Sequence, residues 1–198
     1  DTNTFIKEKN SKLNKIQILT SIKNTQVEIS KVFLENKKHI DNIINELDSE
    51  YIPLSVKDIS ISFMIKEYEK VNINLLSQSE SEKYQEVKSL FLNNDIDSFD
   101  NFRYIFKTLE QEYKTNNKVS KNFINNNKQI DDIITIFTKE TYSNKILNIK
   151  NELGFLEKNG NEKLYELFIK INYLGDFAKA YYVLNEKGVV KYFESSFK

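Results

Sequence analysis

The sequence predicts an all-α fold, an elongated antiparallel helical bundle that ends in a C-terminal helical hairpin. The chain has 198 residues, of which 39% are hydrophobic and 13% aromatic, enough to bury the core of one domain. Its first 153 residues hold no glycine, alanine or cysteine and one proline, so tight turns at positive φ are disfavoured there. Apolar residues recur at spacings of three, four and seven. We therefore expect a single domain, with residues 1–153 as the long-helix bundle and residues 154–198 as the hairpin.

The first predicted element is a helix from about Thr4 to Leu47. Its opposite face carries lysine, asparagine, glutamate and aspartate, which is typical of an amphipathic helix. Such a helix would be roughly 60 Å long at 1.5 Å per residue, a length that favours a bundle or a coiled coil. The predicted core stripe consists of Ile22, Ile29, Phe33, Ile40, Ile43, Ile44 and Leu47.

Pro53 interrupts this pattern within residues 48–55, and the next helix is predicted over residues 59–75. The polar residues 77–81 predict a loop or a helix junction. The apolar positions of the second helix are Ile59, Phe63, Tyr68, Val71 and Leu75.

A short helix over residues 84–91 precedes a longer one, for which Asp97 or Ser98 is the predicted cap. The longer helix runs to Tyr113, and its pattern extends past Val119 to Phe137. Asparagines between residues 116 and 127 weaken this extension, because their side chains compete for backbone hydrogen bonds. A last bundle helix is predicted over residues 142–156, ending at Gly154 or Gly160.

The C-terminal segment predicts two helices on either side of Gly175, with Asp176 as a cap. The alternative is a β-hairpin that pairs residues 181–184 with residues 189–193 across residues 185–188. An isolated two-stranded hairpin is marginally stable, so helices are favoured. The predicted helical faces consist of Leu164, Leu167, Phe168 and Ile171, and of Phe177, Ala180, Val183 and Leu184.

This segment resembles one tetratricopeptide repeat, and the resemblance implies two antiparallel helices. It departs from the repeat at Phe168, Lys187 and Tyr192, where a small residue, alanine and proline are expected. Stacked repeats need about three units, so a hairpin that closes a bundle is favoured over a solenoid. The residues that carry the resemblance are Leu164, Leu167, Ile171, Gly175, Asp176, Phe177, Ala180 and Leu184.

Charge and motifs argue against several function classes. The 29 basic and 29 acidic residues balance, so we expect no nucleic-acid partner. The single histidine, His39, has no second histidine to complete a zinc site, and no cysteine exists. The acidic residues between Asp95 and Asp100 lack the glycine and distant glutamate of a calcium-binding EF-hand loop. We therefore predict no metal, no cofactor, no catalytic residue and no enzymatic activity.

Arg103 is the only arginine, and it lies with Tyr104 and Lys107 on one predicted helix. Its guanidinium suits a ligand carboxylate or phosphate, so these three are candidate ligand-binding residues. A surface ion pair with Asp100 or Glu110 explains Arg103 equally well.

Tyrosines are concentrated in the C-terminal segment, where Tyr181 and Tyr182 are further candidate ligand-binding residues. Tyrosine is amphipathic and suits a pocket or a partner surface. Core packing with the hydroxyl groups at the edge explains these residues equally well.

In overall form the predicted bundle resembles the helical sensor domains that bacterial chemoreceptors and histidine kinases carry outside the cytoplasm. The resemblance rests on the long amphipathic first helix and the helix-prone end of the chain. It implies a non-enzymatic ligand-sensing domain, joined to a membrane only through segments outside this sequence. A small ligand or a partner protein is expected, together with a homodimer, because long bundles often associate side by side.

Two alternatives remain open: a surface-anchored or secreted helical protein that binds a host or partner protein, and a cytosolic helical adaptor. No stretch approaches the 18 to 20 apolar residues of a membrane span. The flanking gene sequence distinguishes the three. A receptor predicts apolar spans on both sides, a surface protein predicts a signal peptide with an N-terminal anchor, and an adaptor predicts neither.

Overall fold

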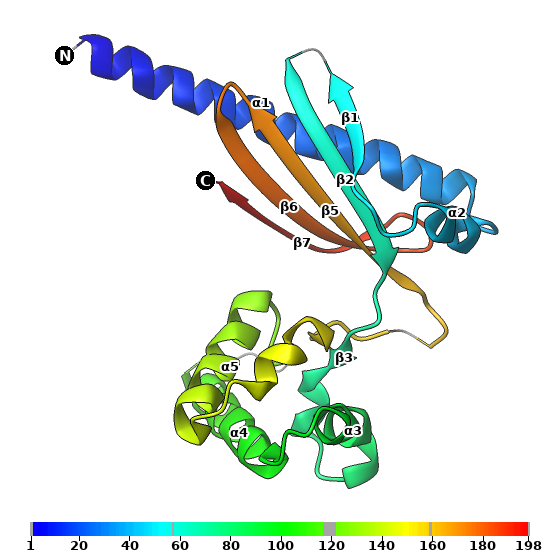
Figure 1. The fold of residues 1–198 in the computed structure, drawn as a ribbon, viewed down its shortest axis with the longest axis vertical. Helices are drawn as coiled ribbons and strands as arrows, with labels where there is room; N and C mark the ends of the chain where they lie inside the picture. Colours follow the sequence, from blue (N-terminus) through cyan, green and yellow to red (C-terminus); the bar gives the residue numbers. More distant parts are fainter. Residues whose placement is uncertain (1, 57, 117–121, 159, 198) are drawn as a thin grey trace. The chain divides into compact units, whose positions relative to one another are not determined.

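The computed structural model describes residues 2–56, 58–116, 122–158 and 160–197. They form two compact units (Figure 1). Unit 1 is Asp1–Tyr68 with Lys158–Lys198, and unit 2 is Glu69–Glu157. Helices occur together with a five-stranded antiparallel sheet, so the predicted all-α bundle with a helical hairpin is wrong.

Unit 1 begins with the long helix α1 (Thr2–Glu35), followed by the short helix α2 (Ile40–Glu46). The helix predicted over residues 4–47 is thus confirmed except for a break at residues 36–39. Most of the predicted stripe is buried, and Ile18 extends it toward the N-terminus. The buried members are Ile22, Ile29, Phe33, Ile40 and Ile44.

One face of the sheet packs against α1, and its strand order β1-β2-β5-β6-β7 follows the chain as an antiparallel meander (Figure 1). The ladder between β2 and β5 continues one step further, where the Tyr68 amide donates to the Leu164 carbonyl over 2.8 Å. The strands are β1 (Ile52–Val56), β2 (Ile59–Glu67), β5 (Leu164–Tyr173), β6 (Asp176–Asn185) and β7 (Val190–Phe197).

The core of unit 1 lies between this sheet and the two helices. Alternate residues of a strand point to opposite faces, so the strand register makes one continuous apolar face. Ala178 and Ala180 are the smallest members, and their size permits close approach of α1 to the sheet. The other buried strand residues of this core are Ile61, Ile65, Tyr165, Leu167, Ile169, Ile171, Tyr182 and Leu184.

Strands replace most of the helix predicted over residues 59–75, whose last three residues lie in a 3-10 helix, and both helices predicted in the C-terminal segment. A spacing of four fits a strand as well as a helix, and Ile61 between Ile59 and Phe63 completes the strand alternation. The stretch that resembles a tetratricopeptide repeat is the β5–β6 hairpin. The alternative β-hairpin is confirmed, because Tyr182 pairs with Phe193 and Leu184 with Val190 in the β6–β7 ladder.

The turn between β6 and β7 rests on the backbone of α1. Gly188 has φ +72°, and a Cβ atom built there would lie 2.5 Å from the Ser30 carbonyl oxygen. The Asn185 side-chain oxygen accepts from the amides of Lys187 and Val189, which holds the turn in shape. The sequence therefore needs glycine at this position for two independent reasons.

Unit 2 is mainly helical, and its core includes the aromatic rings of Phe91, Phe102 and Phe137. The ring centroids of Phe91 and Phe102 lie 4.9 Å apart, and those of Phe102 and Phe137 lie 5.4 Å apart. Its elements are β3 (Val71–Asn72), η1 (Ile73–Ser77), η2 (Ser81–Tyr84), α3 (Gln85–Asn93), α4 (Phe99–Asn116), α5 (Asn127–Thr141), η3 (Lys145–Asn148), η4 (Lys150–Glu152) and β4 (Leu153–Gly154), where η marks a 3-10 helix and β3 pairs with β4 in parallel.

The predicted helices over residues 84–91 and from residue 98 onward are confirmed as α3 and α4. The predicted continuation of the longer helix to Phe137 is interrupted, since residues 122–126 are not helical and the helix resumes as α5. Val119 lies outside the described residues. The helix predicted over residues 142–156 is replaced by η3, η4 and β4.

Candidate binding site

The structure places three predicted ligand-binding residues on α4 in unit 2. Arg103 donates from Nη2 to the Gln78 carbonyl over 2.8 Å, and its guanidinium lies 4.1 Å from the Tyr84 ring centroid. Arg103 therefore ties α4 to the η1–η2 segment. Tyr104 is exposed and Lys107 is half-buried, and neither makes a polar side-chain contact with Arg103 among the described contacts.

The ion pair between Arg103 and Glu110, offered above as an alternative, is not among the described contacts. The Glu110 carboxylate accepts from the Ser77 hydroxyl and from Lys114, each over 2.7 Å. Glu110 thus joins α4 to η1 on its own.

Tyr181 and Tyr182 are neighbours on β6 and therefore point to opposite faces of the sheet. Tyr182 belongs to the core against α1 and packs on Phe193 with ring centroids 4.5 Å apart. Tyr181 donates its hydroxyl to Glu166 over 2.7 Å. Burial raises the pKa of both hydroxyls, and the Glu166 charge raises that of Tyr181 further. Both side chains are buried and hold the fold together, as the structural alternative expected.

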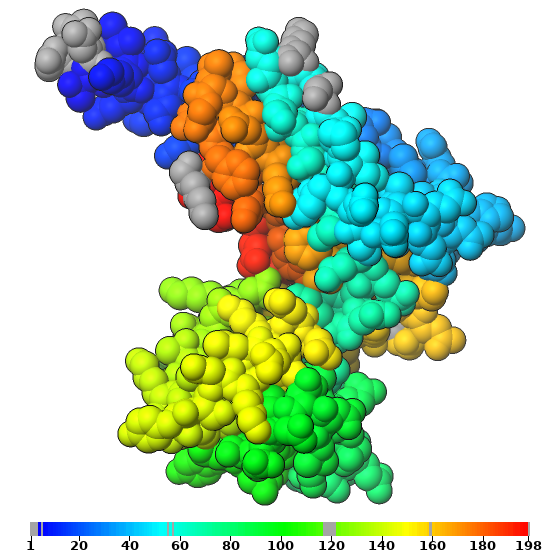
Figure 2. Space-filling view, in the orientation of Figure 1, coloured from blue at the N-terminus to red at the C-terminus, as the bar shows by residue number. Residues whose placement is uncertain are grey.

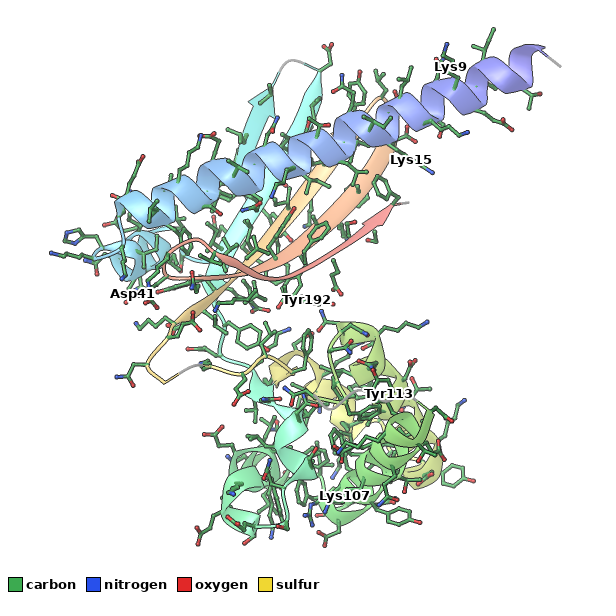
Figure 3. All side chains as sticks on the ribbon, turned by 180° about the vertical axis from the view of Figure 1, so that it is seen from behind. Lys9, Lys15, Asp41, Lys107, Tyr113 and Tyr192 are labelled. Carbon is green, nitrogen blue, oxygen red and sulfur yellow. The ribbon has the colours of Figure 1, made fainter. Side chains whose placement is uncertain are left out.

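Glu166 is a buried carboxylate that the sequence analysis did not identify. It lies on the same sheet face as Tyr181, the face that points away from α1. The Glu166 side chain is 2% exposed, accepts from Tyr181 and lies 3.4 Å from the Lys66 ammonium group. A buried carboxylate needs hydrogen-bond and ion-pair partners, and Tyr181 and Lys66 supply them here. The signal in the sequence was a glutamate within the otherwise apolar run of residues 164–169. Tyr192, seen on β7 in Figure 3, donates to Glu194 nearby.

A second polar cluster links α2 to β5. Asp41, labelled in Figure 3, accepts from the Lys163 ammonium group and from the Tyr165 hydroxyl, each over 2.7 Å. These hydrogen bonds, first that of Lys163 and then that of Tyr165, lower the pKa of Asp41. The cluster is a structural clasp, because all three side chains satisfy one another.

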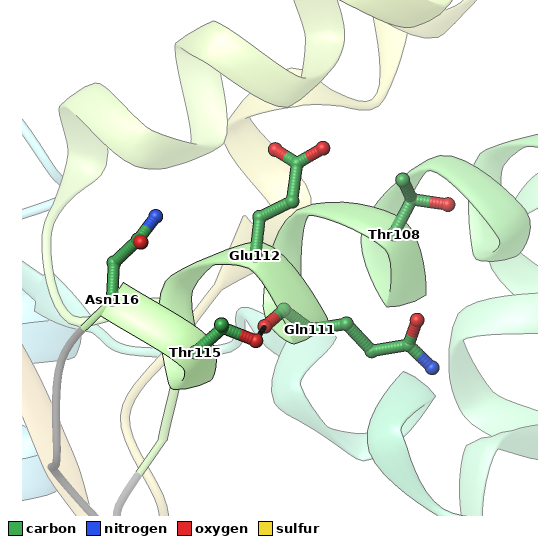
Figure 4. Close-up of a pocket in the computed structure, with 5 residues that line it drawn as sticks. All are labelled: Thr108, Gln111, Glu112, Thr115 and Asn116. Atoms are coloured by element: carbon green, nitrogen blue, oxygen red, sulfur yellow. Dashed lines mark hydrogen bonds between the residues drawn. The ribbon is translucent and has the colours of Figure 1, made fainter.

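A shallow hollow of about 400 Å³ lies along α4 (Figure 4). All of its described lining residues come from this one helix. The hydroxyls of Thr108 and Thr115 donate to carbonyls one turn earlier on the helix, so they are not directed at a ligand. The hollow therefore offers no converging set of functional groups.

A groove of about 670 Å³ between α1 and the β5–β6 turn is the strongest candidate site. Figure 2 shows the first turns of α1 extending past the β5–β6 hairpin, and the described side chains before Ser11 are exposed. Leu13, Ile16 and Leu174 face the groove with 51%, 59% and 69% of their surfaces exposed. The other lining residues are Asn10, Asn14, Gln17 and Tyr173.

The geometry of this groove suits recognition. Its walls are apolar and its rim consists of side-chain amides, one of which, on Asn14, donates to Asp176 over 2.9 Å and fixes α1 to β6. No lining residue is an acid, a histidine or a lysine. Among the described residues, no cluster of three or more histidine or acidic side chains could hold a metal ion. The groove was missed because Leu13 and Ile16 lie off the predicted stripe.

No protein-family model, curated protein or solved structure matches the chain. None of the described helices has an apolar stretch long enough to cross a membrane. The geometry of the groove is therefore what indicates the function of this chain.

Proposed function

We propose that this chain is a non-enzymatic recognition domain that binds apolar side chains of a partner protein in the groove between α1 and the β5–β6 turn. The conformation of Leu174 is the observation that carries this proposal. Leu174 has φ +51° and Gly175 has φ +87°, so both residues of the two-residue turn adopt the left-handed region. Such turns favour Asn-Gly, because asparagine tolerates positive φ better than leucine.

Leucine is a poor choice for the fold at this position. The left-handed conformation costs a non-glycine residue about 1–2 kcal/mol, and the exposed side chain gains little by burial. When a partner covers this leucine, burial of its apolar surface stabilises the complex. Leu13 and Ile16 expose apolar surface beside it, so one partner side chain can contact all three.

The test replaces Leu174 with asparagine. Leu174→Asn should raise the free energy of unfolding by about 0.5–1 kcal/mol, because backbone strain is relieved. It should also weaken binding of amphipathic helical peptides, followed by NMR of the Leu and Ile methyl groups. Leu147→Asn is the matched control, since Leu147 is 50% exposed and lies in unit 2.

Methyl shifts in Leu13, Ile16 and Leu174 that saturate in the wild type and in Leu147→Asn, and weaken in Leu174→Asn, support the proposal. Saturable peptide binding that is the same in all three proteins places the binding surface elsewhere. Absence of saturable binding by any peptide in the panel contradicts recognition by the groove.

Ligand sensing by a bacterial transmembrane receptor, outside the cytoplasm, stays a prediction, as does each of its two alternatives. Its structural basis in the sequence was a helical bundle, which the sheet replaces. An apolar groove supports the part that all three share, which is recognition without catalysis. The flanking gene sequence remains the measurement that separates them.

A further inference from the structure

The side of α1 that points away from the sheet, which we call the outer face of α1, carries a row of apolar side chains. At about 100° per residue, the centre of this face lies roughly 155° from the mean direction of the residues that pack on the sheet. The row is about 42 Å long at 1.5 Å per residue. All of its apolar side chains are exposed except that of Val27, which is half-buried. The row consists of Ile6, Leu13, Ile16, Val27 and Leu34, with Thr20 and Asn24 between them.

Lysines complete the outer face of α1. Lys9, Lys23 and Lys31 lie on it among the apolar residues, and no acidic residue does. The three glutamates of α1 lie about 75–105° from the centre of this face at 100° per residue. Lys23 donates to the neutral Gln26 side chain over 2.9 Å, while Lys31 pairs with Glu28 over 2.7 Å. The outer face is therefore both apolar and positively charged.

This combination indicates what kind of surface covers the outer face. A packed protein partner would have to bury the ammonium groups that lie beside the apolar residues. A bilayer surface avoids this cost, because a lysine buries its methylene stem and places its ammonium group among the lipid headgroups. Anionic headgroups attract lysines at such an interface. We propose that the outer face of α1 binds the surface of an anionic lipid bilayer, with the helix parallel to the membrane.

The fold of unit 1 leaves this face open. The sheet packs on the opposite side of α1, and Figure 2 shows the first turns of α1 extending past the β5–β6 hairpin. Lipid binding does not rest on the proposed function, because Ile6, Leu34 and the three lysines lie outside the groove, although Leu13 and Ile16 belong to both surfaces. The sequence predicted a membrane only through segments outside it, whereas in this proposal α1 itself makes the contact.

Co-sedimentation of the whole chain with lipid vesicles tests the proposal. At about 0.15 M salt the wild type should bind vesicles of equal parts phosphatidylglycerol and phosphatidylcholine, and bind phosphatidylcholine vesicles at least about tenfold more weakly. Binding to the anionic vesicles should weaken as the salt rises to about 0.5 M, because salt screens the lysines. Equal binding to both kinds of vesicle, or binding to neither, overturns the proposal.

Lys9→Gln and Lys7→Gln form a matched pair of variants. They remove the same charge two residues apart, but exposed Lys7 points about 155° away from the centre of the outer face. Lys9→Gln should weaken binding to anionic vesicles about fivefold, the contribution of one lysine near such a surface. Lys7→Gln should weaken it less than about twofold, because its charge lies roughly 10 Å further from the lipid, beyond the screening length. Equal losses mean that net charge and not this face drives binding, which overturns the proposal.

A tryptophan reporter distinguishes a bilayer from an acidic protein, because the chain contains no tryptophan. The emission of Thr20→Trp should shift to shorter wavelength on anionic vesicles, since this residue enters the headgroup region. Lys7→Trp, on the other side of the helix, is the control and should shift less. Binding to poly-glutamate without an emission shift of Thr20→Trp on vesicles indicates an acidic protein partner and overturns lipid binding.

Leu34→Asn and Leu174→Asn separate lipid binding from the proposed function. Leu34 lies on the outer face and outside the groove, so Leu34→Asn should weaken vesicle binding about fivefold or more and leave peptide binding unchanged. Leu174→Asn should weaken peptide binding and leave vesicle binding unchanged. If Leu174→Asn abolishes vesicle binding and Leu34→Asn does not affect it, the lipid contact is the groove, and the proposal for the outer face is wrong.

Discussion

At the scale of single residues, Gly188 leaves less room for a side chain than Gly160 or Gly175 does. Its would-be Cβ atom lies 2.5 Å from the Ser30 carbonyl oxygen and 2.8 Å from the Ser30 Cα atom. Both are backbone atoms of α1, so they move only if the helix moves. The packing of α1 on the sheet therefore depends on the absence of one methyl group.

Gly188→Ala should lower the free energy of unfolding by about 3 kcal/mol or more, from left-handed backbone strain together with displacement of α1. Gly175→Ala is the matched control, because Gly175 has φ +87° and no atom within 4 Å of the added Cβ. Gly175→Ala should lower the free energy of unfolding only by the cost of the left-handed backbone, about 1–2 kcal/mol. Equal losses in urea unfolding would show that α1 does not press on the turn.

Asp41 makes unit 1 sensitive to acid. Its pKa in the folded chain lies below that of the unfolded chain, where an aspartate titrates near about 4. The carboxylate therefore stabilises the fold fully above the unfolded value, and this contribution is lost as the pH falls through the lower folded value.

We expect Asp41→Asn to lower the free energy of unfolding by about 1 kcal/mol at neutral pH, a modest loss because the carboxylate is 45% exposed. The difference from wild type should shrink toward pH 3 in urea titrations. Asp132→Asn, an exposed aspartate on α5, is the control and should show no such pH dependence. A loss that persists unchanged in acid would exclude the carboxylate as its cause.

At the scale of elements, one buried amide holds the segments of unit 2 together. Asn74 accepts from the Ile124 amide and donates to the carbonyls of Ile124 and Phe155, over 3.0, 2.9 and 3.3 Å. It thereby joins η1 to the segment before α5 and to the residue after β4. A buried backbone group that loses its partner is destabilising by about 1–3 kcal/mol.

Asn74→Ala should therefore lower the stability of unit 2 by about 2–4 kcal/mol and speed hydrogen exchange at the Ile124 amide. Asn94→Ala is the control, because Asn94 donates only to Leu90 one helical turn away. Unchanged exchange at Ile124 in Asn74→Ala would show that this amide is not a clasp.

The sequence predicted α1, α3 and α4 because their apolar residues recur at helical spacing. It failed on β5 and β6, where apolar residues on both faces imitate a helical stripe. The scarcity of glycine also led to the wrong expectation that turns at positive φ would be rare. Asp48, Ser49 and Leu174 adopt positive φ without being glycine. The β6–β7 hairpin was disfavoured because an isolated two-stranded hairpin is marginally stable. In the structure it is not isolated, since β5 pairs with β6 and α1 packs on the sheet.

At the scale of the whole molecule, unit 1 is built from the two ends of the chain and unit 2 is inserted between them. The insertion connects β2 to β5, which are antiparallel neighbours with Glu67 opposite Tyr165. A short turn could connect these strands in its place. All buried residues of the α1–sheet core belong to unit 1.

A variant in which residues 69–157 are replaced by a short Gly-Ser linker, with residues 158–163 kept as part of the connection, should therefore fold. It should show cooperative thermal unfolding and a circular dichroism spectrum with both helix and sheet. A variant with the same deletion and Gly188→Ala is the internal check, and it should unfold at lower temperature. A deletion variant without a cooperative transition contradicts the independence of unit 1.

Neither the individual residues nor the individual helices and strands predict the candidate groove. Leu13 and Leu174 are distant in sequence and meet only after α1 has packed on β6. The sequence-predicted ligand residues divide between the two units, three on α4 and two on β6. Tertiary contacts explain Arg103, Tyr181 and Tyr182, whereas Tyr104 is exposed.

The insertion has a consequence for biosynthesis. Ribosomes add about 5–20 residues per second, so the free edge of β2 waits on the order of 5–20 s before β5 emerges to cover it. An uncovered strand edge can recruit other nascent chains. Translation speed through the intervening codons therefore sets how long each newborn molecule is exposed to aggregation.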